Sequence, residues 1–281
     1  MSETLSLGQE PITGSTGPPG ETVIRAEHLE VGFRDKVVWR DASFDIQRGE
    51  FVAVIGPNGA GKTTLFRMLL GLHRPLRGSL SVFGSSPRRG SGRIGYVPQR
   101  HSVDIDTHIS CESFVRLGVT GTRWGPGLAR REEREIATAA LEAVGATEFA
   151  HKCVGTLSGG ELQRIFLAEA MVGNPEMLLL DEPLSNLDIR RSRDLVGLVS
   201  HLVRSRRVTT LLVAHDINPL IQCLDKVIYI ANGRVATGSP NSVLTSESLT
   251  ALYGVRVEVL HDSRNNIVIV GTEEAIGGEH G

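Results

Sequence analysis

A glycine-rich loop, preceded by an apolar run and followed by a helical pattern, constrains the fold of this chain more than any other feature. Residues 56–64 read Gly-Pro-Asn-Gly-Ala-Gly-Lys-Thr-Thr, which fits the pattern G-x-x-x-x-G-K-[ST]. Residues 51–55 are all apolar, as in a parallel strand that is covered on both faces. Apolar residues after the loop recur at helical spacing: Leu65, Met68, Leu69 and Leu72. A strand, a glycine loop and a helix in this order predict an α/β fold with a phosphate site at the helix N-terminus.

The loop is the predicted nucleotide site. Its residues are Gly56, Pro57, Asn58, Gly59, Ala60, Gly61, Lys62, Thr63 and Thr64. Glycines are expected there because side chains would keep the backbone away from the phosphates. We expect Lys62 to neutralise the β- and γ-phosphates and the Thr63 hydroxyl to ligate Mg²⁺. A surface lysine beside a structural glycine turn is the alternative, and the flanking strand and helix argue against it.

Two further apolar runs end in polar residues. Residues 177–180 precede Asp181 and Glu182, and residues 211–214 precede His215. Ligands of open α/β sheets bind at the carboxyl ends of the strands, so these side chains are predicted to face the loop. Asp181 is expected to be the second Mg²⁺ ligand. A solvated acidic turn and a structural histidine are the alternatives.

The composition limits the classes of function. Of the 281 residues 40% are hydrophobic, enough for a substantial core, and a net charge of −2 gives no case for nucleic acid as the main ligand. The three cysteines, Cys111, Cys153 and Cys223, are an odd number without metal-type spacing, which favours small buried residues in a reducing cytoplasm. No apolar stretch approaches the roughly 20 residues that span a bilayer. If the chain acts at a membrane, we expect another subunit to bring it there.

Five motifs in a fixed order carry a family resemblance. They are the loop 56–64, Gln99, Leu157-Ser158-Gly159-Gly160-Glu161, Leu180-Asp181-Glu182-Pro183 and His215. Together they resemble the ATP-binding subunit of ABC transporters, from about Val23 to about Gly238. The resemblance implies ATP hydrolysis with ATP and Mg²⁺ bound. It also implies a P-loop NTPase core of the RecA-like type, with an antiparallel β subdomain and an inserted α-helical subdomain.

The domain boundaries follow from composition and periodicity. Residues 1–21, rich in Gly, Pro, Ser and Thr, are predicted to be a disordered leader without a secretory signal. Residues 22–254 form the predicted ATPase domain, and residues from about 101 to 172 its helical subdomain. Helices are predicted at Arg131–Val144 and Glu161–Val172. Residues 255–281 are predicted to form a hairpin, with strands at 255–260 and 267–270, and a loose tail.

The resemblance also assigns roles to single residues. It implies that Glu182 polarises the attacking water, that His215 contacts the γ-phosphate and that Gln99 contacts the Mg²⁺ site. Phe33 matches the position where the family stacks an aromatic ring on adenine. A core residue of an edge strand is the alternative for Phe33, because aromatic residues are common in strands.

A second anion site is predicted where a helix begins at the Leu-Ser-Gly-Gly-Glu motif, since a hydroxyl, glycine N–H groups and the helix dipole converge there. One ATP does not need both sites within one chain. The resemblance implies a homodimer, in which Ser158, Gly159 and Gly160 of one subunit close over ATP held by the other. Asp188 matches the loop that communicates across this dimer. Glu161 stands where the commonest family version has Gln.

The cargo is inferred from weaker similarities. The segment Gly95–Asp104 resembles the ATPases of bacterial zinc and manganese importers. This implies an integral membrane permease, an extracytoplasmic solute-binding protein and a peripheral location at the cytoplasmic face of the membrane. Residues 107–110, Thr-His-Ile-Ser, depart from a stretch that often carries Pro at the surface facing the permease.

Other readings of the family remain open. Within transport, the alternative is the ATPase of a ferric-siderophore or haem importer. A soluble ABC ATPase acting on DNA or ribosomes is disfavoured, because the sequence has neither long heptad runs nor a second ATPase domain. A regulator without turnover is disfavoured by the presence of Glu182 and His215.

Overall fold

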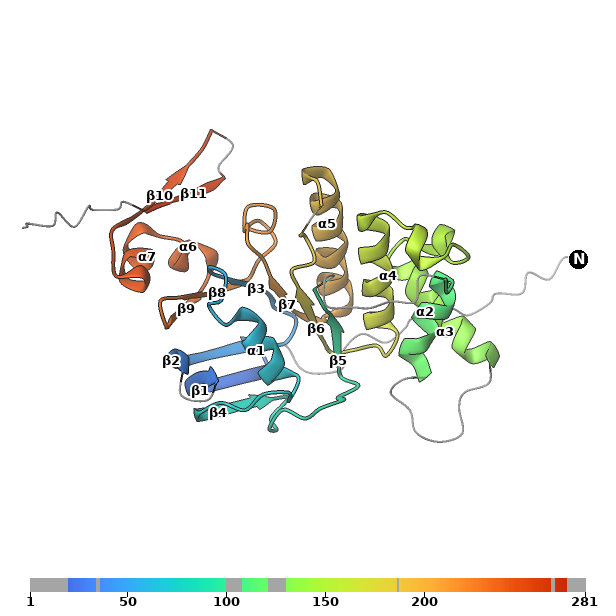
Figure 1. Ribbon diagram of the computed structural model, residues 1–281, viewed down its shortest axis with the longest axis horizontal. Coiled ribbons are helices and arrows are strands. Elements are labelled where there is room, and N and C mark those ends of the chain that lie inside the picture. Colours follow the sequence, from blue (N-terminus) through green and yellow to red (C-terminus); the bar gives the residue numbers. More distant parts are fainter. Residues whose placement is uncertain are drawn as a thin grey trace, which may run out of the picture.

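The described residues form a six-stranded sheet, a three-stranded sheet and a two-stranded hairpin, with helices around them (Figure 1). The computed structural model describes residues 20–33, 36–99, 108–120, 130–185, 187–263 and 266–271. Most of the predicted leader, nearly all of the tail and residues 100–107 fall outside these ranges. Among the described residues, no helix has the length and apolarity needed to cross a membrane.

The larger sheet is six-stranded, with the order β5-β6-β7-β3-β8-β9. In that order the strands are Ile94–Val97, Met177–Asp181, Thr209–Val213, Phe51–Ile55, Lys226–Ala231 and Arg234–Gly238. All neighbouring pairs are parallel except β8 and β9, which are antiparallel. Three of the strands lie where the apolar runs predicted them, and the predicted α/β class is confirmed.

Both faces of this sheet are buried. Every residue of β3, β6 and β7 is buried. On one face, Val52, Val54 and their neighbours pack against α1 (Lys62–Leu69) and the smaller sheet. On the other face, Leu178 and Leu212 pack against α5 (Ile189–Arg206). This double cover is why the strands read as continuous apolar runs in the sequence.

The smaller sheet is antiparallel, with the order β2-β1-β4. Its strands are Lys36–Gln47, Thr22–Phe33 and Arg77–Val82. Ile24 of β1 pairs with Ile46 on one side and Val82 on the other, and all three are buried over α1. The phosphate-loop helix is therefore held between two sheets.

The prediction that Leu72 belongs to the buried apolar stripe of α1 is wrong. Leu65, Met68 and Leu69 are fully buried, but the helix ends at Leu69 and Leu72 is 49% exposed. Gly71 has φ 69°, and the N–H groups of Gly71 and Leu72 donate to the carbonyls of Met68 and Arg67. These bonds form a left-handed helix end, which reverses the chain before Leu72 reaches the core.

Helices α2 (Cys111–Thr120), α3 (Arg130–Ala143) and α4 (Gly159–Met171) pack together at one end of the molecule (Figure 1). Two short 3₁₀ turns, Thr147–Phe149 and Val154–Thr156, lie between α3 and α4. The start of α4 is two residues earlier than the sequence pattern predicted. Ser158 caps the helix and Glu161 completes a capping box, so Glu161 is the third residue of the helix rather than its first.

The C-terminal elements lie at the opposite end of the molecule (Figure 1). They are α6 (Pro240–Val243), α7 (Ser246–Tyr253) and an antiparallel hairpin of β10 (Val257–His261) and β11 (Ile267–Gly271). Val255, which the alternating pattern placed in the first strand, lies before it and is 56% exposed.

A buried arginine joins the starts of three strands on the side away from the phosphate loop. The Arg48 side chain is 4% exposed, and its Nε and Nη1 lie 2.7 Å from carboxylate oxygens of Glu21 and Glu176 respectively. Arg93, just before β5, also donates to Glu176, which precedes β6. The hydrogen bond from Arg93, together with Arg48, holds the pKa of Glu176 below its usual value.

Replacing the Glu176 carboxylate should destabilise the fold. Glu176→Gln leaves Arg48 with one fewer counter-charge, and we expect the free energy of unfolding at pH 7 to fall by about 1–3 kcal/mol. Because the pKa of Glu176 is lowered in the folded state, its contribution is present above the unfolded pKa and lost as pH falls through the folded one. Urea titrations from pH 7 to pH 3 should therefore show the wild type and the variant converging in acid.

The exposed pair Arg25–Asp45 provides the control. Asp45→Asn should change the free energy of unfolding by less than about 0.5 kcal/mol. An equal effect of the two substitutions would contradict the importance of burial at Arg48.

Candidate nucleotide site

The strand order brings the predicted site residues to one edge of the larger sheet. Gln99 follows β5, Asp181 and Glu182 end β6, His215 follows β7, and the loop 56–61 follows β3. These four strands are neighbours in the sheet in that order. Parallel strands end at the same edge, so residues separated by up to 159 positions in sequence meet there.

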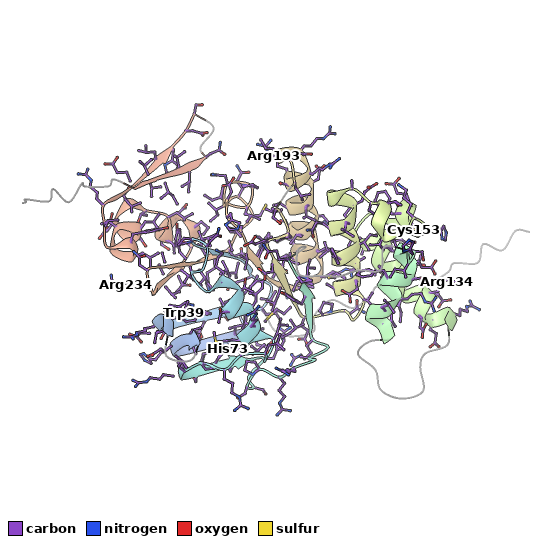
Figure 2. All side chains as sticks on the ribbon, in the orientation of Figure 1. Trp39, His73, Arg134, Cys153, Arg193 and Arg234 are labelled. Carbon is purple, nitrogen blue, oxygen red and sulfur yellow. The ribbon has the colours of Figure 1, made fainter. Side chains whose placement is uncertain are left out.

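The glycines of the loop are required, but the structure gives a different reason from the predicted one at two of three positions. A Cβ on Gly56, where φ is 144°, would lie 2.0 Å from the carbonyl oxygen of Ile230 in β8. A Cβ on Gly61 would lie 2.8 Å from Nε1 of Trp39, the buried β2 residue marked in Figure 2. Only Gly59 of the three has open space beside it. Gly56 and Gly61 thus let two strands approach the loop.

Lys62 is enclosed by the loop that precedes it. Its side chain begins at the first residue of α1, and the residue is 5% exposed. The ammonium donates to the carbonyl oxygens of Gly56, at 2.7 Å, and Pro57, at 2.9 Å. Burial lowers the pKa of Lys62, while Glu182 and Asp181 raise it. The cation is therefore fixed in the loop, close to two carboxylates.

Asp181 is a buried carboxylate with one unused oxygen. The residue is 3% exposed, and Oδ1 has no hydrogen-bond partner among the described residues. The other contacts of the carboxylate are the Thr63 side chain and the Tyr96 hydroxyl, whose oxygen is 3.4 Å from Oδ2. Burial, and then the neighbouring Glu182, raise the pKa of Asp181. A free carboxylate oxygen beside a threonine hydroxyl is the type of oxygen donor set that Mg²⁺ binds.

Glu182 is held between two of the other predicted site residues. Its Oε2 accepts a hydrogen bond from Gln99 Nε2 at 2.7 Å, and Nε2 of His215 lies 2.9 Å from Oε1. The backbone of Glu182 has φ 53°, and its carbonyl accepts hydrogen bonds from the N–H and the hydroxyl of Ser185. The Glu182 side chain is 14% exposed and that of His215 48% exposed. The carboxylate is thus oriented from both sides at a partly open position.

The Ser-Gly-Gly motif opens α4, as the second predicted anion site requires. Ser158 is the N-cap residue, and its N–H donates to Glu161 Oε2 at 2.7 Å. Lys152 lies 3.6 Å from the other oxygen of Glu161. Hydrogen bonds from Ser158 hold the pKa of Glu161 below its usual value. Glutamate at this position therefore stabilises the helix start, and no hydrogen bond joins the motif to residues 56–64 within the described parts of the chain.

Asp188 connects α5 to this motif. It caps α5 by accepting a hydrogen bond from the N–H of Arg191 at 2.8 Å. A Cβ on Gly160 would lie 3.4 Å from Cδ of Arg191, so the start of α5 packs against the start of α4. Asn186 and the side chain of Phe33 lie outside the described residues, and the predicted adenine contact stays a prediction.

Two contacts were not anticipated from the sequence. Tyr96 borders Asp181, and burial, followed by the charge of Asp181, raises its pKa to about 12. Ser185 fixes the turn after Glu182. A polar residue within an otherwise apolar strand was the available signal for Tyr96, whereas a serine two residues after a proline gives none.

A comparison with protein-family models identifies the family. Residues 39–185, which include the loop, the Ser-Gly-Gly motif and Glu182, match the model described as ABC transporter. The chain belongs to the ABC transporter family. It is an ATPase, and its ABC domain binds ATP.

Curated relatives match over most of their length. The manganese transport system ATP-binding protein MntB of Bacillus subtilis (strain 168) is 35% identical over 85% of this chain and 95% of its own. The zinc import ATP-binding protein ZnuC of Pseudomonas entomophila (strain L48) is 32% identical over 92% and 98%. The ferric enterobactin transport ATP-binding protein FepC of Escherichia coli (strain K12) is 34% identical over 85% and 90%.

A solved structure supports the fold over most of the chain. It is an inward-facing transporter described as of the metal-chelate type, 26% identical, with a TM-score of 0.77. The match covers 90% of this chain and 99% of that chain.

Proposed function

We propose that this ATPase energises the uptake of a divalent metal ion, zinc or manganese, through a separate membrane permease. An extracytoplasmic solute-binding protein would deliver the metal, and the ATPase would act at the cytoplasmic face of the membrane. The observation that supports this cargo is the similarity to the manganese and zinc ATP-binding proteins over 85% and 92% of the chain. Import of a ferric chelate is the second candidate, supported by the ferric enterobactin relative.

In the proposed mechanism, the residues at the sheet edge divide the work of binding and hydrolysis. The loop and Lys62 bind the β- and γ-phosphates. Thr63, Asp181 and Gln99 would hold Mg²⁺, which would neutralise charge on the phosphate oxygens. Water attacks the γ-phosphorus, the bond to the β–γ bridging oxygen breaks, and Glu182 accepts the proton of the water. Gln99 and His215, at 2.7 and 2.9 Å, hold the two carboxylate oxygens in place.

Glu182→Gln should separate binding from turnover. Gln keeps the shape of the side chain but removes the proton acceptor, so we expect kcat to fall by about 10²–10⁴-fold with MgATP affinity retained. Lys62→Ala should weaken binding as well. Trp39 lies beside Gly61, so its fluorescence in a Trp124→Phe chain, which has no other tryptophan, measures binding. Wild-type turnover of Glu182→Gln would exclude this residue as the base.

We further propose that two copies of the chain share each ATP. Two helix starts, at Gly61 and Ser158, exceed what one nucleotide needs within one chain. The contact of Arg191 with Gly160 places the Asp188 loop next to the second of these helix starts. In a head-to-tail dimer, ATP lies between Lys62 of one copy and Ser158 of the other.

Mixing two defective chains tests this sharing. Lys62→Ala and Ser158→Arg should each be inactive as homodimers. In the mixed dimer one site carries both defects and the other pairs an intact Lys62 with an intact Ser158, so ATPase activity should appear. Two differently tagged Lys62→Ala chains are the control and should stay inactive.

If mixed dimers form without activity, cysteines placed at positions 62 and 158 decide the outcome. Crosslinking between chains supports sharing with both sites required for turnover. Crosslinking only within a chain contradicts sharing.

Growth of a deletion strain tests the cargo. Loss of the gene should make cells sensitive to a metal chelator, and added Zn²⁺ or Mn²⁺ should restore growth. Restoration only by a ferric siderophore or haem would assign the chain to the second candidate function. A membrane pull-down that recovers no permease would contradict a role in transport.

A further inference from the structure

His215 lies at the start of a long irregular connection. Strand β7 ends at Val213 and β8 begins at Lys226. The N–H of Ala214 donates to the carbonyl of Val54, which anchors the residue before the histidine. His215 and Asp216 are both exposed. The placement of the imidazole therefore depends on what holds the residues that follow it.

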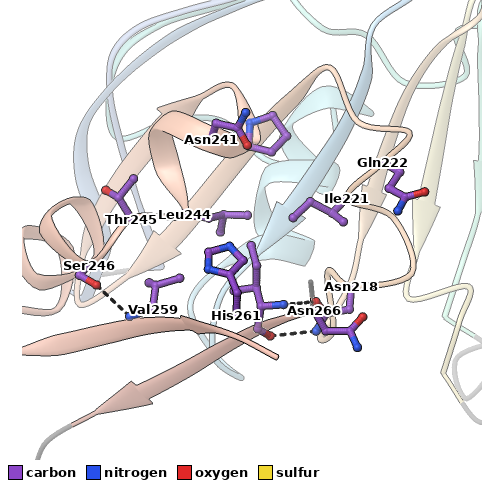
Figure 3. A pocket seen from close by; sticks show the side chains of 12 residues that line it. Asn218, Ile221, Gln222, Asn241, Leu244, Thr245, Ser246, Val259, His261 and Asn266 are labelled. Atoms are coloured by element: carbon purple, nitrogen blue, oxygen red, sulfur yellow. Dashed lines mark hydrogen bonds between the residues drawn. The ribbon is translucent and has the colours of Figure 1, made fainter. Parts of the chain in front are cut away.

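Asn218 fixes the residues that follow His215. Its N–H and its Nδ2 both donate to Asp216 Oδ1 at 2.9 Å, which closes a tight turn directly after His215. Its Oδ1 accepts from the N–H of Ile267 at 2.6 Å, and its Nδ2 also donates to the carbonyl of Ile267 at 3.0 Å. The amide thus binds both backbone groups of one residue in β11, 49 positions away in sequence. Figure 3 shows Asn218 and Asn266 next to each other, where the hairpin meets this connection.

The hairpin is anchored elsewhere through its other strand. The N–H of Val259 in β10 donates to the Ser246 hydroxyl at 2.9 Å, and the N–H of Val257 donates to the Thr250 hydroxyl at 3.0 Å. Both hydroxyls belong to α7. The hairpin therefore links α7 to the connection after His215, with one strand bound to each.

Packing is incomplete at the second of these links, where hydrogen bonds join the hairpin to the connection. A cavity of about 430 Å³ lies between the hairpin, the connection, α6 and α7. Figure 3 shows His261, Val259 and Gln222 around it. Ile267 is 8% exposed and belongs to the main core, so β11 itself is firmly placed.

We propose that Asn218 is a positioning residue for ATP hydrolysis: it ties the connection after His215 to β11 and so keeps the histidine against Glu182. The inference rests on the proposed role of His215. Asparagine suits the task because a planar amide presents a donor and an acceptor side by side, which matches the N–H and C=O of a strand edge. Aspartate has the same shape but no donor.

Two substitutions break the tie from opposite sides. Asn218→Asp removes the Nδ2 donor to the Ile267 carbonyl and to Asp216 Oδ1, and faces a carboxylate towards both acceptors. The backbone N–H of residue 218 still donates to Asp216. Ile267→Pro removes the backbone N–H that donates a hydrogen bond to Asn218 Oδ1. Ile267 pairs with His261, and its N–H donates to Asn218, so proline at this position leaves the hairpin ladder intact.

Two control variants keep the hydrogen bonds between Asn218 and Ile267. Ile267→Val retains the backbone N–H. Asn241→Asp makes the same chemical change at another amide lining the cavity, one that has no hydrogen bond to the described residues.

All variants are made in the full chain, and ATP turnover is measured together with amide hydrogen exchange of residues 214–225. We expect Asn218→Asp and Ile267→Pro each to lower kcat by about tenfold or more, because a small misplacement of a catalytic group is costly. The KM for ATP should stay within about twofold, since neither residue contacts the predicted nucleotide site. Exchange of residues 214–225 should accelerate in both variants and not in the controls.

The double variant shows whether the two residues act through one link. If they do, the kcat of the double variant Asn218→Asp with Ile267→Pro should equal that of the slower single variant, because the interaction is already lost. Additive losses, or equal losses in the control variants, would overturn the proposal. So would faster exchange of residues 214–225 with unchanged kcat, which would mean that the tie holds the segment without positioning His215.

His215→Ala separates this inference from the function on which it rests. If His215→Ala is inactive while Asn218→Asp and Ile267→Pro have wild-type kcat, the positioning role of Asn218 is wrong and that of His215 stands. If His215→Ala has wild-type turnover, the proposed role of His215 is wrong and the inference falls with it.

Discussion

The burial of the parallel sheet on both faces determines where chemistry can take place in this protein. Strands β3, β6 and β7 have no exposed residue, so a polar functional group within them would lose its hydration without gaining a ligand. Polar side chains are therefore confined to the strand ends. The strand order β5-β6-β7-β3 then places Gln99, the Asp181–Glu182 pair, His215 and the phosphate loop side by side. The cover of the sheet by α1 on one face and α5 on the other is thus a precondition of the site.

The elements that local pattern controls could be predicted from the sequence. The apolar runs gave β3, β6 and β7 within one or two residues, and the motif order gave the family. Properties that depend on contacts between distant segments could not be predicted. The steric need for Gly56 arises from Ile230, in a strand whose position next to β3 no local pattern reveals. The end of α1 was missed although Gly71 marks it, because the spacing of Leu72 continued the helical pattern.

The site residues also fall into those that a local pattern reveals and those that only contacts between distant segments reveal. Lys62, Asp181 and His215 have a motif or a strand end to identify them, and the structure places them along one sheet edge. Tyr96 and Asn218 contact residues 85 and 49 positions away. The local pattern offers only the polarity of Tyr96 within an apolar strand, and only the tertiary structure reveals Asn218. Glu161 lies between these cases: its capping box with Ser158 is a local pattern, and its ion pair with Lys152 is a tertiary contact.

The backbone at Glu182 places opposing demands on the evolution of this chain. A residue with a side chain at φ 53° is less stable there than glycine would be, by about 1 kcal/mol. Mutations that relieve this strain favour folding but remove the carboxylate that Gln99 and His215 hold. Substitutions that raise stability at this position therefore oppose the proposed catalytic role of Glu182. In a descendant of this chain, glycine or asparagine at position 182 would mark the loss of selection for turnover, even with every other motif intact.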